Sequence, residues 1–137
     1  MRKLLVDNDI IIDLLAERHP FATDAQQLFT HAEGHRIQLY VSALTFANTH
    51  YLLSRQLSRT KTRQVLRQLS SLVSVIALDT RLLDLALESE FGDFEDAIQY
   101  YSAVSVSADV IITRNHSDFK FSSIPVMSAK EYLAQPN

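Results

Sequence analysis

The chain has 137 residues, the length of one ordinary domain, so we expect a single domain over residues 1–137 with one sizeable core. It contains no cysteine, which excludes disulfides and thiolate metal sites and leaves oxygen and imidazole groups as metal ligands. The formal net charge of -3 argues against a protein that coats nucleic acid nonspecifically, but it is compatible with a nuclease that has an acidic centre. No apolar stretch is long enough for a signal peptide or a membrane span, so we expect a cytoplasmic protein.

The N-terminal part of the chain predicts strands that alternate with helices. Residues 3–6 are a short apolar run that predicts a strand, and residues 10–16 continue it with the spacing of a helix. Residues 21–33 predict a second helix, which Gly34 ends. Residues 37–41 are again short and apolar, so they predict the second strand.

The middle of the chain predicts two helices, a strand and a further helix. Ser42 can cap the first of these helices, and Thr60 can cap the second. The apolar face that we expect for the first helix consists of Leu44, Ala47, Tyr51 and Leu52. Residues 73–78 predict the third strand, and a leucine-rich helix follows it to about residue 90.

The C-terminal part completes the alternation. Asp93 can cap a helix over residues 94–106, and residues 110–113 are a β-branched run too short for a helix. Residues 124–127 predict an edge strand before a last helix that starts at Ser128. Short apolar strands between amphipathic helices indicate an α/β fold, so we expect a mostly parallel sheet of four or five strands with helices on both faces.

Acidic side chains follow two of the predicted strands and begin one of the predicted helices. They are Asp7 and Asp9 after the first strand, Asp93 and Asp96 at the helix start, and Asp118 after residues 110–113. Because ligands of an open parallel sheet bind beyond the carboxyl ends of its strands, these acids converge on one hollow if the strands at residues 3–6 and 110–113 are neighbours. Each acid alone has a structural alternative, as a helix cap or a turn residue.

Clustered carboxylates repel one another and take up protons unless a cation neutralises them. Their convergence without a nearby lysine therefore indicates a divalent metal, and oxygen ligands favour Mg²⁺ or Mn²⁺. Such a site can bind a substrate phosphate, and a second metal would complete a clamp on the attacking and leaving oxygens. The sequence therefore predicts hydrolysis of phosphodiester bonds.

Three motifs carry a resemblance to a known family. They are Leu-Leu-Val-Asp-Asn-Asp-Ile-Ile-Ile-Asp over residues 4–13, Asp-Phe-Glu-Asp-Ala-Ile-Gln-Tyr-Tyr over 93–101 and Ile-Thr-Arg-Asn-His-Ser-Asp-Phe over 112–119. In this order and spacing they resemble the PIN domain, and within it the small bacterial branch of VapC-like toxin ribonucleases, over nearly the whole chain. The resemblance implies a PIN-like fold in which Asp7, Asp96 and Asp118 are catalytic metal ligands. It also implies a secondary metal role for Asp93 and a ligand or orienting role for Asn115.

One position departs from the family's pattern. The family commonly has a glutamate in the helix after the second strand, whereas this chain has Asn48 there. An asparagine can coordinate or hydrogen-bond through its carbonyl oxygen, but it carries no negative charge and cannot act as a general base. We nevertheless expect a working variant, in which Asn48 supports the site.

The resemblance also implies an activity and partners. PIN-domain ribonucleases cleave RNA with Mg²⁺ or Mn²⁺, by in-line attack of water that leaves a 5′-phosphate and a 3′-hydroxyl. Toxin members are often homodimers, and a small antitoxin silences them by covering the acidic groove. We therefore expect the toxin of a toxin–antitoxin pair, with RNA as its substrate.

A basic stretch without acids lies in the middle of the chain, and its members are Arg55, Arg59, Lys61, Arg63 and Arg67. It could bind RNA phosphates or an acidic segment of an antitoxin, and the alternative is a solvated helix face. Arg114, beside the predicted site, could contact a phosphate or form an internal salt bridge with an acidic neighbour.

Two other functions fit part of the pattern. A catalytically weak or inert PIN-like module that binds RNA or protein is suggested by Asn48 and the negative net charge. A phosphatase resembling the haloacid dehalogenases would use Asp7 as its nucleophile and Asp9 as its acid or base. The leucine-rich helix before Asp93 disfavours the phosphatase, because that family has a strand there.

Overall fold

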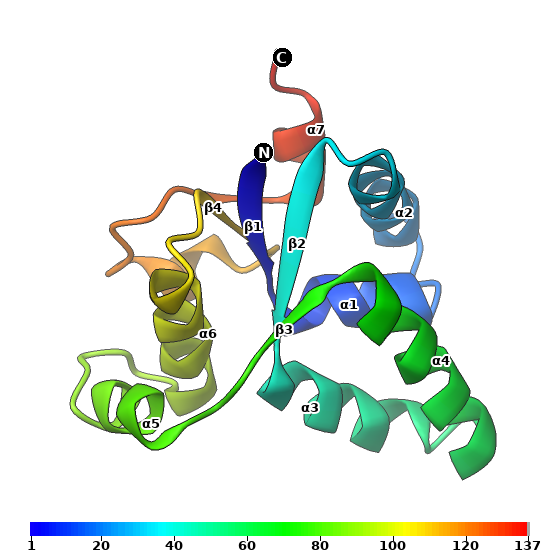
Figure 1. Ribbon diagram of the computed structural model, residues 1–137, viewed down its shortest axis with the longest axis horizontal. Coiled ribbons are helices and arrows are strands. Elements are labelled where there is room, and N and C mark those ends of the chain that lie inside the picture. Colours follow the sequence, from blue (N-terminus) through cyan, green and yellow to red (C-terminus); the bar gives the residue numbers. More distant parts are fainter. Residues whose placement is uncertain (137) are drawn as a thin grey trace.

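The five strands of residues 1–136, the part of the chain that this computed structural model describes, form one sheet (Figure 1). They are β1 (Arg2–Val6), β2 (Ile37–Ser42), β3 (Ser74–Ile76), β4 (Val110–Ile112) and β5 (Val126–Met127). Their order is β3-β2-β1-β4-β5, and all neighbours are parallel. β1 and β4 are adjacent, with Leu4 opposite Val110. The acids that follow these two strands can therefore converge, as the prediction required.

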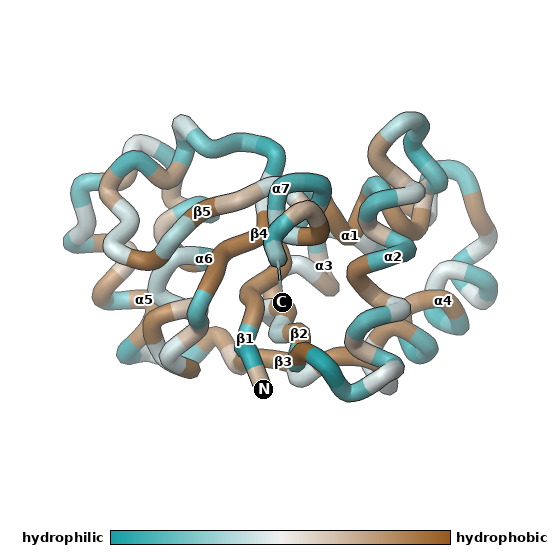
Figure 2. Tube along the Cα trace, turned by 90° about the horizontal axis from the view of Figure 1, so that it is seen from above, coloured by the Kyte–Doolittle hydropathy of each residue, from teal (hydrophilic) through white to brown (hydrophobic). Residues whose placement is uncertain are grey.

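Helices cover both faces of the sheet, as predicted (Figure 2). Within residues 1–136 they are α1 (Asn8–Leu15), α2 (Phe21–Glu33), α3 (Ala43–Leu53), α4 (Arg59–Leu72), α5 (Thr80–Leu87), α6 (Phe94–Ser105), α7 (Ala129–Leu133) and the 3₁₀ turn η1 (His116–Phe119). Side chains of α1, α2, α4 and α7 pack on one face, and those of α5 and α6 pack on the other. Residues 1–136 thus form a single α/β domain. None of these helices is long and apolar enough to cross a membrane.

The central strand shows why its sequence is apolar throughout. Leu4 and Val6 point into the core beneath α1 and α2, whereas Leu5 points into the core beneath α6. All three side chains are fully buried. A strand with helices on both faces has no solvent side, so it needs a continuous apolar run and not an alternating one. The run ends at Asp7, where the chain leaves the sheet and α1 begins.

The predicted apolar face of α3 is wrong at three of its four positions, since only Leu44 packs against the core. Ala47, Tyr51 and Leu52 are exposed, and the buried residues of this helix are Thr45, Thr49 and Leu53. The reason is that α3 begins at the carboxyl edge of the sheet, where it packs against α1 and α4, and where Gln99 of α6 bonds to Thr45. The burial of Thr45 is tolerated because its hydroxyl is hydrogen-bonded to neighbouring side chains.

The predicted cap of the next helix is also wrong. Ser58, and not Thr60, is the N-cap of α4, and its hydroxyl accepts a hydrogen bond from the Lys61 amide at 3.1 Å. Thr60 lies inside the first turn and has no capping bond. Both residues are common caps, so composition alone did not separate two candidates that lie two positions apart.

Removing this cap should destabilise the protein measurably. We expect Ser58→Ala to lower the free energy of unfolding by about 1 kcal/mol, because an amide of the first turn loses its acceptor. Thr60→Ala is the matched control, and its effect should stay within about 0.5 kcal/mol, as for an exposed site. Urea unfolding of both variants measures the difference. A larger loss in Thr60→Ala than in Ser58→Ala would contradict this assignment of the cap.

Candidate functional site

A hollow of about 280 Å³ lies beyond the carboxyl ends of β1 and β4, between α1, α3 and α6. Its lining includes every metal ligand and both supporting amides predicted from the sequence: Asp7, Asp93, Asp96, Asp118, Asn48 and Asn115. These side chains come from four separate segments of the chain. The parallel sheet brings the segments together because its strands all end at the same edge.

Asp7 is the most buried acid of the hollow, with 6% of its surface exposed. One carboxylate oxygen caps α1 by accepting from the Asn8 amide at 2.8 Å, and the other accepts from the Thr113 hydroxyl at 2.8 Å. Burial is the main cause that raises the pKa of Asp7 to about 7, and the charge of Asp9 is the second. The two hydrogen bonds lower this pKa and so oppose part of the rise. Asp7 is thus fixed in place but carries an unfavourable charge.

Asp96 lies in the first turn of α6, opposite Asp7. Asp93 is the N-cap of this helix and accepts from the Asp96 amide at 3.0 Å, so it has the structural role of a cap as well as a place in the hollow. The pKa of Asp96 is raised to about 7, chiefly by burial. The negative charges of Asp93, Asp118 and Asp7 are smaller causes of the same rise. The carboxylates of the three motifs therefore lie close enough to act on one another.

The chemistry of this donor set fits a divalent cation of the Mg²⁺ or Mn²⁺ type. The side chains offer carboxylate and amide oxygens, and their mutual repulsion is relieved when a cation enters. Across residues 1–136, no three acidic or histidine side chains are gathered tightly enough to enclose an ion. Asp93 and Asp118 are exposed, and both line the hollow together with Asp7 and Asp96.

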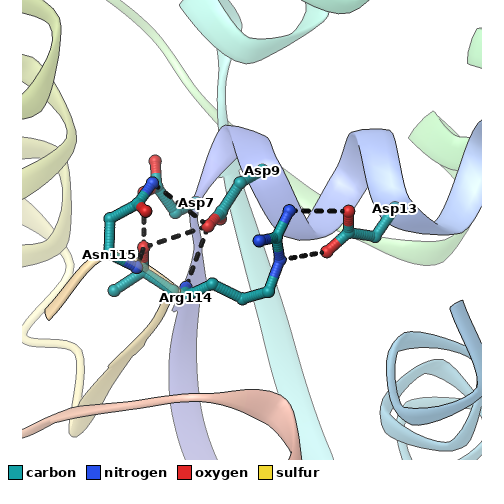
Figure 3. Close-up of polar contacts among 6 residues, drawn as sticks. Asp7, Asp9, Asp13, Arg114 and Asn115 are labelled. Carbon is teal, nitrogen blue, oxygen red and sulfur yellow. Dashed lines mark hydrogen bonds and ion pairs between the residues drawn. The ribbon is translucent and has the colours of Figure 1, made fainter. Parts of the chain in front are cut away.

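Hydrogen bonds that Asp9 accepts and an ion pair of Arg114 hold the segment after β4 against α1 (Figure 3). Asp9 accepts from the Arg114 amide at 2.9 Å and from the Asn115 side-chain amide at 3.4 Å. The Arg114 guanidinium forms two bonds to the buried Asp13 carboxylate, at 2.7 and 3.0 Å, and stacks on Phe21. The internal salt bridge is therefore present, and Arg114 does not line the hollow.

The basic stretch lies apart from the acidic residues. Arg55 follows α3 and packs on the ring of Tyr51, and the other four side chains are exposed on α4. The lining of the hollow includes none of the five residues Arg55, Arg59, Lys61, Arg63 and Arg67. Their proposed contacts with RNA or an antitoxin would therefore be made outside the hollow.

Four further polar side chains line the hollow without having been predicted from the sequence: Asn8, Arg18, Glu95 and Gln99. Gln99 stands three positions after Asp96, and this spacing on one helix face could have revealed it. Arg18 lies in the turn after α1 and had no comparable signal. Its cationic side chain borders a hollow that is otherwise acidic.

The raised pKa values predict how stability depends on pH. In the folded, metal-free protein Asp7 and Asp96 keep their protons up to about pH 7, whereas in the unfolded chain such groups ionise near pH 4. The unfolded state therefore binds fewer protons between these values, and stability falls as the pH rises from 5 to 8.

We expect the unfolding temperature with chelator to fall over this range. The fall should be smaller in Asp96→Asn, which lacks one of the two groups. Mn²⁺ should raise the unfolding temperature most at pH 8, where the carboxylates are ionised. Differential scanning calorimetry at a series of pH values checks this, and an equal slope in both proteins would contradict it.

The chain matches a family model described as PIN domain over residues 3–117. No curated protein matches it. Among solved structures it is similar to DNA-bound VapBC from Salmonella typhimurium, at 16% identity and a TM-score of 0.70, over 94% of this chain and 99% of the other. A toxin–antitoxin complex from Klebsiella pneumoniae matches at 25% identity and a TM-score of 0.68, over 92% and 97%. The sarcin-ricin-loop-cleaving toxin VapC20 from Mycobacterium tuberculosis matches at 17% identity and a TM-score of 0.66, over 89% and 98%.

The two kinds of comparison cover most of the chain. The family model extends from residue 3 in β1, through the whole of α6, to residue 117 after β4. The solved structures align over about nine tenths of the chain or more, so the likeness extends to the whole sheet and its helices. The chain belongs to the PIN-domain family.

Proposed function

We propose that this protein is a metal-dependent ribonuclease that hydrolyses phosphodiester bonds of RNA in the hollow at the carboxyl edge of the sheet. The observation that carries the proposal is the convergence of Asp7, Asp96 and Asp118 from three distant segments, with two of the three held at a raised pKa. A fold gains nothing from such repulsion, so a cationic ligand is its natural explanation. VapC20, which has the same fold, is a sarcin-ricin-loop-cleaving toxin.

Each side chain has a proposed part in the site. Asp7, Asp96 and Asp118 would hold Mg²⁺ or Mn²⁺, with Asp93 as a secondary ligand. The bound ion supplies a water of lowered pKa and neutralises charge on the phosphate. Thr113 holds the Asp7 carboxylate in position, and Asp9 holds the amide of Asn115. Arg18 is placed to attract a phosphate at the rim.

The partners are proposed from the relatives. Structures of VapBC and of a toxin–antitoxin complex share this fold, which supports a toxin role with a small antitoxin as partner. A homodimer is also proposed. The exposed basic residues Arg59, Lys61 and Arg63 could bind RNA or an acidic segment of the antitoxin from the surface of α4.

Of the alternatives, an inert binding module is favoured by one observation, the presence of Asn48 in the hollow. The phosphatase is disfavoured, because Asp93 lies between α5 and α6 and not at the end of a strand. Membership of the PIN-domain family points the same way.

The test is cleavage of a panel of structured and single-stranded RNAs by the purified protein, with Mn²⁺, with Mg²⁺ and with chelator. The proposal predicts metal-dependent cleavage that leaves 5′-phosphate and 3′-hydroxyl ends. The Asp7→Asn substitution should abolish this cleavage. Asp109→Asn is the matched control, because Asp109 is an exposed acid at the opposite edge of the sheet, where it binds the Lys3 amide. Absence of both cleavage and metal binding in the folded protein would favour the inert module.

A further inference from the structure

Glu95 is the one acid of the hollow that the motif analysis left without a role. Its carboxylate accepts a hydrogen bond from the side-chain amide of Asn48 at 3.3 Å, across 47 positions of sequence. Glu95 belongs to α6 and Asn48 to α3, and both side chains line the hollow. The contact therefore joins the two helices at the place where the acids meet.

Within the described part of the chain, no lysine, arginine or histidine side chain forms an ion pair with Glu95. The ion pairs found in residues 1–136 are Arg114 with Asp13 and His116 with Glu131. A carboxylate that only favoured the helix dipole could point to solvent, whereas this one is bonded to a neutral donor at the hollow.

A second observation, independent of the acids, indicates a ligand at the same place. Gln99 lies one turn further along α6 and has only 2% of its surface exposed. Its amide nitrogen donates to the Thr45 hydroxyl at 2.8 Å, but its carbonyl oxygen has no hydrogen-bond partner within residues 1–136. Because an unpaired buried acceptor is costly, this oxygen at the hollow indicates that a further donor, such as a cation-bound water, belongs there.

We infer that Glu95 is a fifth metal-binding carboxylate of the site, beside those of Asp7, Asp93, Asp96 and Asp118, and that Asn48 is the positioning residue that orients it. The inference rests on the proposed function. It explains how the site works without a glutamate on α3: the acid comes from α6, and α3 supplies the amide that holds it. Hydrogen bonding to a neutral amide leaves the charge of Glu95 available to a cation.

The first test is calorimetric titration of the full chain with Mn²⁺, which needs no RNA substrate. Glu95→Gln should raise the dissociation constant for Mn²⁺ at least about 10-fold, as expected when an acid that serves a metal is neutralised. The matched control is Glu90→Gln, which neutralises an exposed acid outside the hollow and should leave the constant unchanged. Thermal unfolding in chelator shows that both variants are folded.

The second test exchanges the two side chains. In Asn48→Glu/Glu95→Gln the acid returns to α3, and the glutamine amide can donate to it, so the hydrogen bond is kept with donor and acceptor reversed. This double variant should bind Mn²⁺ more tightly than Glu95→Gln and approach the unsubstituted protein. A carboxylate that only stabilised the start of α6 would not be rescued from α3.

The outcomes separate this inference from the proposed function. If the unsubstituted protein binds Mn²⁺ and cleaves RNA while Glu95→Gln binds Mn²⁺ equally well, the inference is overturned and the proposed function stands. Weaker binding in Glu95→Gln without recovery in the exchange variant would also overturn it. Absence of Mn²⁺ binding by the unsubstituted protein would overturn both.

Discussion

Replacing Asp96 with asparagine should lower the rate of metal-dependent RNA cleavage by at least about 100-fold. Loss of a group that only supports a metal ligand already costs about 10-fold to 100-fold in affinity or activity, so loss of a ligand should cost at least as much. Asparagine keeps the size and the backbone amide that bonds to Asp93, so α6 keeps its cap. Single-turnover cleavage at saturating Mn²⁺ measures the effect.

The same variant should not lose stability. The raised pKa of Asp96 shows that its negative charge destabilises the metal-free fold. At pH 8 a neutral side chain therefore removes repulsion between Asp96 and the neighbouring carboxylates. Asp84→Asn is the matched control, because Asp84 is exposed on α5 outside the hollow. Unchanged turnover in Asp96→Asn would remove Asp96 from the site, and unfolding of the variant would show that its role is structural.

Replacing Arg114 with alanine should lower the free energy of unfolding by about 3 kcal/mol, the largest stability effect that we expect from one polar substitution. Asp13 is completely buried, and the Arg114 guanidinium is its ion-pair partner. Removal of one partner of such a pair leaves an uncompensated charge in the interior. Denaturant unfolding at pH 7 measures the loss.

A double variant separates this cause from lost packing. In Arg114→Ala/Asp13→Asn the buried charge is gone, so the double variant should be more stable than Arg114→Ala alone, although it carries one more substitution. If the two losses simply added, the buried charge would not be the source of the effect. Loss of the stacking of Arg114 on Phe21 would then account for it.

The fold class could be predicted from the sequence because helices on both faces impose a simple pattern. Leu4, Leu5 and Val6 are apolar in succession since all three are buried, and that run is visible without a structure. The face of α3 could not be predicted in this way. Thr45 is buried there because Ser42 and Gln99 satisfy its hydroxyl, and that network depends on residues 54 positions apart.

The acids of the hollow could also be predicted from local patterns in the sequence. Asp7 comes directly after an apolar strand, and Asp96 lies in the first turn of the helix that Asp93 caps. Their convergence was an assumption until β1 and β4 were seen to be neighbours, since strand order depends on long-range pairing. The contact between Asn48 and Glu95 had no local signal at all. Each residue was visible in the sequence, but only the packing of α3 beside α6 brings them together.

The most direct test of the account is the position of Mn²⁺ in crystals of the protein soaked with the ion, located by anomalous scattering. The account predicts one strong peak in the hollow, with oxygen ligands from Asp7 and Asp96 at about 2.0–2.2 Å, close to the distance typical of Mg²⁺. It also predicts that this peak disappears in Asp96→Asn. Mn²⁺ bound elsewhere with the hollow empty, or a peak that persists unchanged in the variant, would contradict the assignment of the metal site.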